Sequence, residues 1–550
     1  MDGKQSGGFK VWTPLFFSVV MVGGMALGFN LRDTLRGKRD IQAVMQRNDR
    51  LEQIIDLINE KYVDSVKTDE LYKGAIEGIL SDLDPHTSYI PADELEEVNE
   101  DLEGSFYGIG VEFYIFDDTM NVTAVVPGGP ADKAGVITGD KIIKVGDSVI
   151  AGRQIPSDNV IKMLKGRLNS KVSVMLKDPV SNAMKQLTIA RGEIPVVSVD
   201  ANIMLDSKTG YIKINRFSAT TYDEFARALK GLKASGMEQL VIDLRQNPGG
   251  YLEAAQRIAD ELLEGDKLIV YTKGIHSKRI DYKTEGLQGF EKGKIAILID
   301  EGSASASEIL SGAVQDYDRG IIVGRRSYGK GLVQEQYDLD DGAALRLTVA
   351  KYYIPSGRCI QRSYKNGRDA YDEDFMRRFE NDVLKGNDSI ITDDTARYYT
   401  ANKRVVYGGG GIKPDVFVPF DTARLTPGLS NMLYSEDARR TVWNYYMHYR
   451  AQLLQYKTIT DFSTKYGGDE LVAGFLKMQD PTFRRAVERV LRNQTNLSYF
   501  RLQLKAQLAR ILFRSNGYYS ITTWDDAVIR KAMETMNSTR YSAIIGRQGF

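Results

Sequence analysis

The sequence has few of the residues on which most hydrolytic and metal sites depend. Cys359 is the single cysteine, and His86, His276 and His448 are the three histidines. One thiol forms no internal disulfide, and without a cysteine cluster there is no cysteine-based zinc site. The zinc-protease motif HExxH is also absent. A site built on histidine therefore has few candidates, although sequence distance alone does not exclude a Ser-His-Asp arrangement.

The sequence also lacks net charge. Lys and Arg total 73, as do Asp and Glu, so the basic excess typical of nucleic-acid-binding proteins is missing and we expect no nucleic-acid partner. Hydrophobic residues make up 42% of the 550 positions, which is enough to form buried cores. At about 150 residues per domain, this length predicts three or four domains.

A long uncharged stretch lies near the N-terminus. Residues 11–29 read VWTPLFFSVVMVGGMALGF, and these 19 residues are enough to span a bilayer core of about 30 Å. A cleaved signal peptide is the alternative, but Ala26-Leu27-Gly28 matches a cleavage site only loosely. We therefore expect an uncleaved anchor within residues 1–30. Basic residues flank the stretch on both sides, so the positive-inside rule leaves its orientation open.

The rest of the chain divides by its hydrophobic pattern. Residues 31–103 are predicted to be helical, because apolar residues recur there at helical spacing. Residues 104–195 have short apolar runs between Gly, Pro and Asp turns, which predicts a compact β-rich unit. From residue 196, strand and helix patterns alternate as far as 362 and resume over 403–425, which favours an α/β layer with crossover helices.

Two further segments differ from this α/β pattern. The polar stretch 363–402 is interpreted as a surface insertion. Residues 426–550 are predicted to form a separate helical domain, with one apolar stripe made of Phe483, Val487, Val490 and Leu491. The predicted fold class is thus a multidomain α/β and α+β protein with a transmembrane helix and helical regions at both ends.

The serine-rich turn around Ser305 is the first candidate for chemistry. The segment Gly302-Ser303-Ala304-Ser305-Ala306-Ser307-Glu308 lies between an apolar strand and a helix. A serine at a helix N-terminus is near free N–H groups and the positive end of the helix dipole, which can stabilise an oxyanion. By itself the segment is more often an ordinary turn with a helix-capping serine.

Lys330 strengthens this hypothesis. It lies between two glycines, just after the next predicted strand. A serine hydroxyl needs a base to become a nucleophile, and a lysine whose pKa is lowered by burial can serve. Gln334 would point to the same side of a strand as Lys330, so its amide can orient the amine. The alternative is a surface lysine in a glycine turn.

The third candidate is the loop Asp243-Leu244-Arg245-Gln246-Asn247-Pro248-Gly249-Gly250, which ends a strand and opens a helix. Its glycines can supply a backbone N–H to an oxyanion. They could also cradle a phosphate, but neither a Walker lysine nor GxGxxG is present. A plain glycine-rich turn is the remaining interpretation.

Together these segments resemble the carboxyl-terminal processing (tail-specific) protease family. SASASE, QDYDRG and VGRRSYGKGLVQ reproduce its active-site block in order and spacing, and DPHTSY, GYI, LTVA and YIPSGR are similar as well. The resemblance covers about residues 45–360 and resumes near 411–418. It implies that Ser305 is the nucleophile, Lys330 the base and Gln334 its support, with oxyanion donors at Ala306 and Gly250. Arg325 departs from the family, which commonly has an acidic residue there.

The β-rich unit resembles a protease-associated PDZ domain. It begins with Gly108-Ile109-Gly110-Val111 and continues with GPADKAGV and a Gly-Asp pair. Successive N–H groups in a glycine-rich loop can bind a terminal carboxylate while the peptide adds as a strand. The resemblance implies that Gly108, Ile109, Gly110 and Val111 bind peptide C-termini. The alternative is a PDZ fold that only packs against the protease.

These observations favour a serine endopeptidase with a Ser-Lys dyad that processes proteins recognised by their C-termini. A non-enzymatic PDZ adaptor on an inactive protease scaffold is the alternative, but Ser305, Lys330 and Gln334 are all present. No metal or cofactor is required. The family resemblance places the catalytic part in a bacterial periplasm, anchored to the inner membrane. A homo-oligomer or an adaptor that binds the C-terminal helices is a further expectation.

Overall fold

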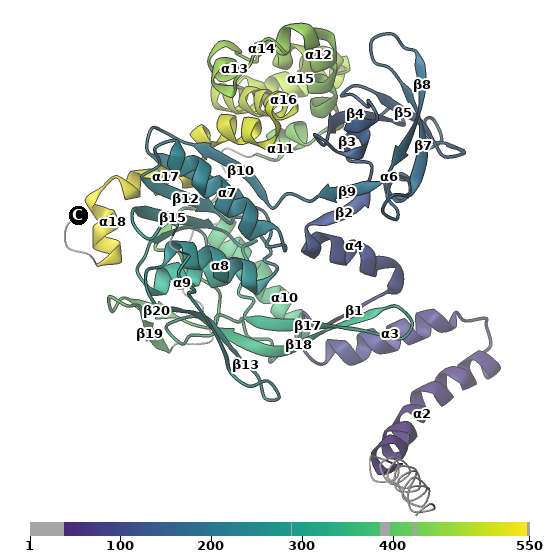
Figure 1. Ribbon diagram of the computed structural model, residues 1–550, viewed down its shortest axis with the longest axis vertical. Helices are drawn as coiled ribbons and strands as arrows, with labels where there is room; N and C mark the ends of the chain where they lie inside the picture. The colour runs from purple at the N-terminus through teal and green to yellow at the C-terminus, as the bar shows by residue number, and fades with distance from the viewer. Residues whose placement is uncertain (1–37, 288, 385–395, 422–425, 547–550) are drawn as a thin grey trace, which may run out of the picture. The chain divides into compact units, whose positions relative to one another are not determined.

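The computed structural model describes residues 38–287, 289–384, 396–421 and 426–546, and the chain divides into two compact units, Met1–Leu83 and Asp84–Phe550 (Figure 1). The expected anchor at 11–29 lies outside the described residues. Among the residues that are described, no helix combines the length and the apolar character needed to cross a membrane.

In the described part of the first unit, residues 38–83, the helices are α2 (Lys38–Lys61) and α3 (Thr68–Ser81). Both fall within the stretch predicted to be helical. Ile54, Leu57 and Ile79 are more than half exposed.

The β-rich unit is an antiparallel sheet, and the chain enters it and leaves it through one short pair of strands. Helix α4 (Ala92–Glu103) leads into β2 (Ser105–Gly108), which pairs with β9 (Gly192–Pro195), so Ser105 lies opposite Pro195. Between them the strand order is β3-β4-β5-β7-β8, with β6 paired to β5. The elements are β3 (Val111–Phe116), β4 (Thr119–Val125), α5 (Pro130–Lys133), β5 (Lys141–Val145), β6 (Ser148–Val149), α6 (Ser157–Leu164), β7 (Lys171–Lys177) and β8 (Met184–Ala190).

The α/β core is a six-stranded sheet of order β10-β11-β12-β15-β16-β21. It is parallel from β11 to β21, and β10 joins antiparallel to β11. Every residue of β11 is buried, as expected for a strand covered on both faces. The strands are β10 (Val199–Met204), β11 (Thr209–Ile214), β12 (Gln239–Asp243), β15 (Lys294–Ile299), β16 (Ile321–Gly324) and β21 (Val416–Phe417).

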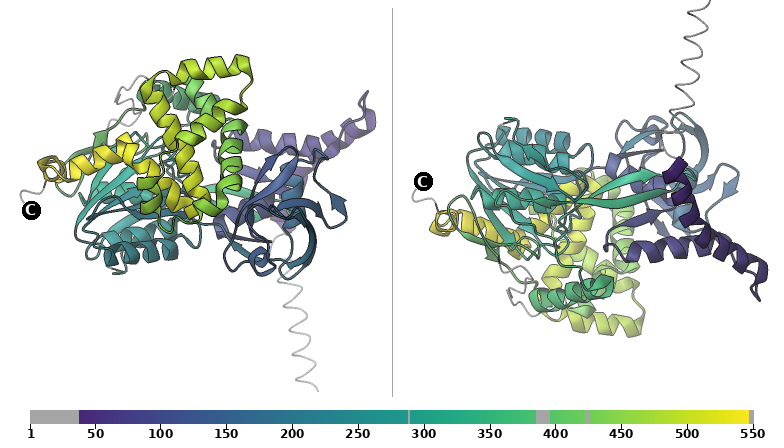
Figure 2. Two further views of the ribbon diagram at one scale, coloured as in Figure 1. Left: turned by 90° about the horizontal axis from the view of Figure 1, so that it is seen from above. Right: turned by 90° about the horizontal axis from the view of Figure 1, so that it is seen from below.

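Helices cover the two faces of this sheet. On one face, α7 (Thr221–Ala234), α8 (Leu252–Leu262) and α9 (Ala306–Asp316) share a core with the strands. On the other, α17 (Ala527–Met536) and α18 (Thr539–Ile545) bury Ile529 and Tyr541. Figures 1 and 2 show α17 and α18, in yellow, beside the sheet. The prediction of one separate C-terminal domain is therefore wrong for 527–545, which completes the α/β core.

The other C-terminal helices form their own apolar core. They are α11 (Pro427–Leu433), α12 (Glu436–Leu453), α13 (Ile459–Lys465), α14 (Asp469–Met478), α15 (Pro481–Leu491) and α16 (Gln494–Thr522), followed by the 3-10 turn Thr523–Asp525. Val487 and Leu491 are buried as predicted, but Phe483 is 48% exposed, so the expected stripe is shorter. Phe116 of β3 joins this core, which ties the helices to the β-rich unit.

A second sheet was not predicted from the sequence. It has the order β1-β18-β13-β14, and β17 also pairs with β18. The strands are β1 (Ser88–Ile90), β13 (Leu268–Lys273), β14 (Ile280–Lys283), β17 (Leu332–Asp338) and β18 (Ala344–Tyr353). The antiparallel β17–β18 hairpin begins two residues after Lys330 and places Gln334 opposite Thr348. This sheet brings the β1 segment near Ser88 into register with Arg346.

Candidate active site

Ser305 occupies a strained turn between the end of β15 and the start of α9. Its backbone has φ 56° and ψ −115°, a region that residues with a side chain rarely adopt. Its N–H donates to Glu308 Oε2 over 2.9 Å, and its carbonyl accepts the Tyr352 hydroxyl over 3.1 Å. Strain of this kind is retained where the surroundings fix it, and it is frequent at functional sites.

Glu308 joins the serine turn to the lysine turn. It is fully buried and accepts the N–H of Ser305, Gly329 and Lys330 at 2.9, 2.8 and 2.9 Å, and the Ser327 hydroxyl at 2.5 Å. Burial raises the pKa of the Glu308 carboxyl to about 7, although these four donors oppose the shift. One carboxyl group therefore holds two loops that are distant in sequence.

Lys330 lies just before β17 and is partly buried. Its Nζ donates to Gln334 Oε1 over 2.8 Å, and Gln334 Nε2 donates to the carbonyl of His86 over 2.6 Å. Burial lowers the pKa of Lys330 below its usual value, and the nearby Arg346 cation adds to the shift, while Asp84 and Glu308 oppose it. A lysine with a lowered pKa has a larger fraction of neutral amine near neutral pH, and only the neutral amine can accept a proton.

The glycine loop packs directly on the serine turn. A Cβ added to Gly249 would lie 2.7 Å from the Ser305 Cβ and 2.9 Å from the Ala306 nitrogen, so only glycine fits there. The Gly249 N–H donates to Asn247 Oδ1 over 2.9 Å. In contrast, neither the Gly250 nor the Ala306 N–H donates a hydrogen bond within the described part of the chain. These two donors are available to a ligand.

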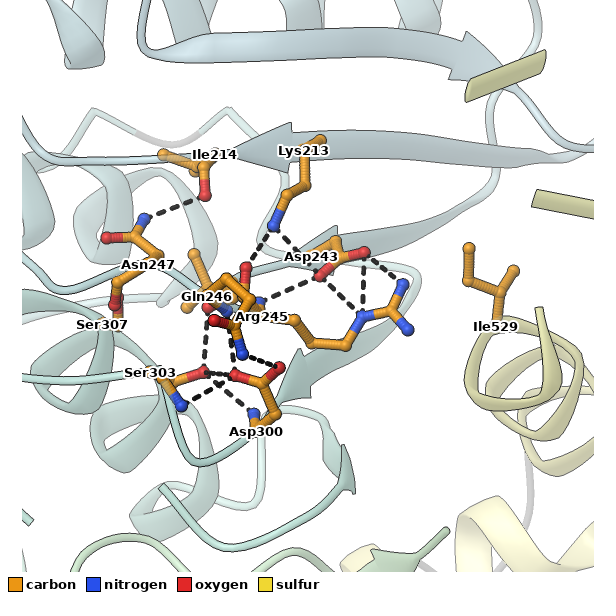
Figure 3. Close-up of polar contacts among 12 residues, drawn as sticks. Lys213, Ile214, Asp243, Arg245, Gln246, Asn247, Asp300, Ser303, Ser307 and Ile529 are labelled. Atoms are coloured by element: carbon orange, nitrogen blue, oxygen red, sulfur yellow. Dashed lines mark hydrogen bonds and ion pairs between the residues drawn. The ribbon is translucent and has the colours of Figure 1, made fainter. Parts of the chain in front are cut away.

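A largely buried polar network holds this loop in place (Figure 3). Arg245 and Lys213 both contact the Asp243 carboxylate, which lowers the pKa of that buried acid despite its desolvation. Gln246 donates through its backbone and side chain to Asp300, both over 2.8 Å. Asn247 donates to the Ile214 carbonyl over 2.9 Å, and the Ser307 hydroxyl donates to the Asn247 carbonyl over 3.0 Å. The loop and the serine turn are therefore fixed relative to each other.

Ser305, Lys330, Gln334 and Gly250 line one cleft with a volume of about 840 Å³. Its apolar walls come from α4, α8, α9 and the β17–β18 hairpin, including Val98, Leu102, Leu252, Ile309, Leu332 and Val333. The structure thus brings the predicted nucleophile, base and base-supporting amide to the same cavity.

The polar insertion was interpreted as a surface segment, and its first helix buries only one side chain but is anchored to the lysine turn through it. Helix α10 (Gly367–Arg378), which continues as the π-helix Phe379–Leu384, packs on the lysine turn. Arg378 donates to the Ser327 and Gly410 carbonyls at 3.2 and 2.9 Å. Tyr371 is fully buried and hydrogen-bonds to His86 Nε2 at 3.1 Å. The buried tyrosine anchors a helix whose other residues are mostly polar.

Further on, β19 (Arg397–Tyr399) pairs with β20 (Val405–Tyr407).

His86 is the site-proximal residue whose position the sequence analysis did not predict. Its ring contacts Tyr371, and burial together with the Lys330 cation lowers its pKa to about 4. The preceding Asp84 accepts the His86 and Thr87 N–H groups at 2.8 and 3.0 Å, which fixes the turn. The sequence contains the motif DPHTSY, but only the fold shows that the His86 carbonyl accepts a hydrogen bond from Gln334.

Arg325, the departure from the family pattern, has an acidic partner in this fold. Its guanidinium contacts both Glu301 oxygens, with Nε–Oε2 at 2.8 Å and Nη2–Oε1 at 3.1 Å. The substitution is therefore accommodated by a paired contact outside the cleft.

The predicted peptide-binding loop lies at the start of edge strand β3. Gly110 has φ 78°, and an added Cβ would lie 2.9 Å from Ile194 Cδ1. The Ile109 and Gly110 carbonyls accept the Ala131 and Val126 N–H groups, whereas their own N–H groups have no acceptor in the described chain. The Ile109 side chain is in the domain core, so only its backbone faces a ligand.

Within the described residues, no group of three or more His, Cys, Asp or Glu side chains could hold a metal ion.

Comparison with known families identifies three regions. Residues 208–367 match the model of "Peptidase family S41", residues 28–94 that of "Activating protease CtpB N-terminal domain", and residues 122–177 that of a "PDZ domain". The first contains Ser305, Lys330 and Gln334. The residues of the predicted peptide-binding loop lie just before the third.

Individual proteins are similar over part of the chain. A "Probable CtpA-like serine protease" of Staphylococcus aureus (strain N315) is 34% identical over 313 residues, which are 56% of this chain and 62% of that protein. A protein of the same description from Staphylococcus epidermidis is 31% identical over the same shares. The chain thus covers less than two thirds of these relatives. The solved structure "Photosystem II D1 C-terminal processing protease" is 28% identical, with 58% of this chain and 90% of that chain covered and a TM-score of 0.33.

Proposed function

We propose that this chain, whose residues 208–367 belong to peptidase family S41, is a serine endopeptidase with Ser305 as nucleophile and Lys330 as general base. The observation that carries the proposal is the pair of loops held by Glu308. A strained serine at a helix N-terminus and a lysine with a lowered pKa line the same cleft. A nucleophile and its base need this proximity.

The reaction follows from these positions. Neutral Lys330 takes the Ser305 hydroxyl proton as the serine oxygen attacks the peptide carbonyl carbon. The negative charge on the carbonyl oxygen is stabilised by the N–H groups of Ala306 and Gly250, which donate no hydrogen bond within the described residues, and by the N-terminal end of α9. Lys330 then gives its proton to the leaving amine, and water hydrolyses the acyl-enzyme. Gln334 orients the lysine amine throughout.

We further propose that the PDZ domain presents protein C-termini to this cleft. The support is the pair of unpaired N–H groups at Ile109 and Gly110, next to edge strand β3, whose only ladder partner within the described residues is β4. An extended peptide can add to such an edge while its carboxylate binds the loop N–H groups. Protein substrates with accessible C-termini are the expected partners.

The proposed activity is tested with full-length protein in detergent and an unfolded substrate protein with an apolar C-terminus. Ser305→Ala and Lys330→Ala should both abolish cleavage, because nucleophile and base act as a unit. Lys330→Arg should stay inactive, since a guanidinium does not give up its proton. Robust cleavage by Lys330→Ala would exclude the Ser-Lys assignment. Absence of cleavage by the wild-type protein, with peptides still bound, would favour the adaptor alternative.

We also propose that residues 11–29 anchor the chain in a bacterial inner membrane, with the catalytic part in the periplasm. The support is the length and apolar character of this stretch. N-terminal sequencing of the membrane-bound protein should find residues before Val11. A mature start near Leu31 would identify a cleaved signal peptide instead.

A further inference from the structure

Arg346 is a cationic side chain within the cleft to which the dyad chemistry assigns no role. It lies on β18 directly opposite Gln336 of β17, and Gln334 is opposite Thr348 on the same hairpin. Because side chains two residues apart on a strand share a face, Arg346 is on the same face of the hairpin as Gln334, which contacts Lys330. The guanidinium therefore belongs to the wall beside the catalytic lysine, and it lines the same cavity.

The charges around this cavity are not balanced. Arg216, the other arginine of the cleft, forms an ion pair with Asp101. Arg346 donates through Nη2 to the neutral Gln336 Oε1 over 3.0 Å, and within the described residues no carboxylate lies at ion-pair distance from it. Glu308 is fully buried behind Ser305. The cleft that contains Ser305 is thus also lined by a cation, Arg346, that has no carboxylate partner among the described residues.

Burying the Arg346 cation without a neighbouring negative charge is unfavourable in free energy. The pKa of Arg346 is lowered by burial, and Tyr251, which lines the cleft with it, opposes the shift. A guanidinium presents parallel N–H donors that match the two oxygens of a carboxylate, and such charge-assisted pairs are stronger than neutral hydrogen bonds. A carboxylate from outside the chain would supply the missing partner.

We propose that Arg346 binds a carboxylate of the substrate lying in the cleft, so that it selects acidic peptide segments. The inference rests on the proposed protease function, because it names the substrate chemistry of that same site. The carboxylate comes either from an Asp or Glu side chain near the scissile bond or from the free C-terminus of a short substrate. Both have the same planar group, and the experiment separates them.

The experiment compares matched quenched-fluorescent decapeptides. In one series, C-terminally amidated peptides have Glu or Gln at each position in turn. In the other, the peptides lack acidic side chains and end in an acid or an amide. The enzymes are the wild type, Arg346→Gln and the control Arg227→Gln, which removes an exposed arginine that donates only to its own helix carbonyl at Asp223.

We expect the wild type to cleave the Glu peptide better than its Gln partner, by about tenfold in kcat/KM, at one or two positions. Arg346→Gln should lose this ratio, and Arg227→Gln should keep it. An acid-to-amide ratio that depends on Arg346, without any Glu-to-Gln ratio, would identify the C-terminus as the source. A ratio that persists in Arg346→Gln belongs to another site, such as the PDZ loop. Equal ratios in the wild type and Arg346→Gln for both series overturn the proposal.

Binding measurements keep the test independent of catalysis. Fluorescence anisotropy with the same peptides, unquenched, compares Ser305→Ala with the double variant Ser305→Ala/Arg346→Gln. Loss of affinity for only the acidic peptides supports the proposal even if Arg346→Gln is inactive, and unchanged affinities overturn it. A wild type that binds acidic peptides through Arg346 but cleaves none would contradict the proposed protease function alone.

Discussion

The backbone N–H groups of Ser305 and Lys330 donate to the same oxygen atom, Oε2 of Glu308, each over 2.9 Å. The two residues are 25 positions apart, yet one buried carboxyl group fixes both backbones. The strained φ of Ser305 and the turn before β17 thus depend on a side chain that takes no part in the bond-making steps.

Activity should increase with pH until Lys330 is neutral. Burial and Arg346 lower the lysine pKa, so the midpoint of the kcat/KM profile should lie below 10.5, the usual lysine value. Arg346→Gln removes a nearby cation and makes the ammonium form easier to hold, so this midpoint should move to higher pH. The measurement is kcat/KM against pH with a peptide free of acidic residues. A midpoint that does not move would show that Arg346 does not act on the lysine.

Glu308→Gln should reduce kcat by at least about tenfold, because its amide N–H₂ would face donors that need an acceptor. The wild-type acid limb should also include a titration near 7, since protonation of Glu308, with a pKa of about 7, replaces an acceptor by a donor. The variant should lack it. Glu301→Gln is the matched control, because that carboxylate pairs with Arg325 outside the cleft. Full activity of Glu308→Gln would mean that the Ser305 and Lys330 turns keep their positions without the Glu308 carboxylate.

Gln334→Ala should lower kcat less than Lys330→Ala, because the amide only orients the amine through a 2.8 Å hydrogen bond. Replacing His276 or His448 by Gln, one at a time, should leave the chemical step largely intact. His86→Gln should do the same, since its carbonyl, and not its ring, accepts from Gln334. Single-turnover cleavage with folded variants measures the step. Loss of that step on replacing one histidine would favour a Ser-His mechanism.

The PDZ loop should distinguish a free C-terminus from a blocked one. Full-length Ser305→Ala should bind an apolar-tailed peptide acid clearly better than its C-terminal amide, because the loop N–H groups favour a negative charge. Gly110→Ala should lose this difference, since a Cβ there meets Ile194 at 2.9 Å on a backbone with φ 78°. Calorimetric titration gives both affinities. Equal binding of acid and amide would leave the domain with a packing role only.

The last helices should be as important for stability as the central sheet. Ile529→Ala, at a position 2% exposed against the six-stranded sheet, should destabilise the α/β core by about 2–5 kcal/mol. Val487→Ala, in the core of α11–α16, should instead destabilise the C-terminal helices. Thermal unfolding monitored together with residual cleavage separates the two. If Ile529→Ala left the melting of the α/β core unchanged, α17 would not belong to it.

The sequence itself determined the candidate site residues and much of the local structure. The small-residue turn at 302–308, the glycines around Lys330 and the hydrophobic periods of β11, β12, α7 and α8 are local patterns, and local patterns can be read without a fold. The alternation of strand and helix predicted from residue 196 corresponds to β11, α7, β12 and α8, which follow one another in that order. The family descriptions matched at 208–367 and 122–177 agree with the resemblance.

Only the tertiary structure decided which distant segments share the site. The sequence does not show that α10 would bury Tyr371 against His86, that α17 and α18 would cover the six-stranded sheet, or that β18 would place Arg346 in the same cleft as Lys330. Each depends on pairing or packing between residues tens to hundreds of positions apart. Local propensity carries no information on such pairs, because the free energy that selects them comes from surfaces that meet only in the folded chain.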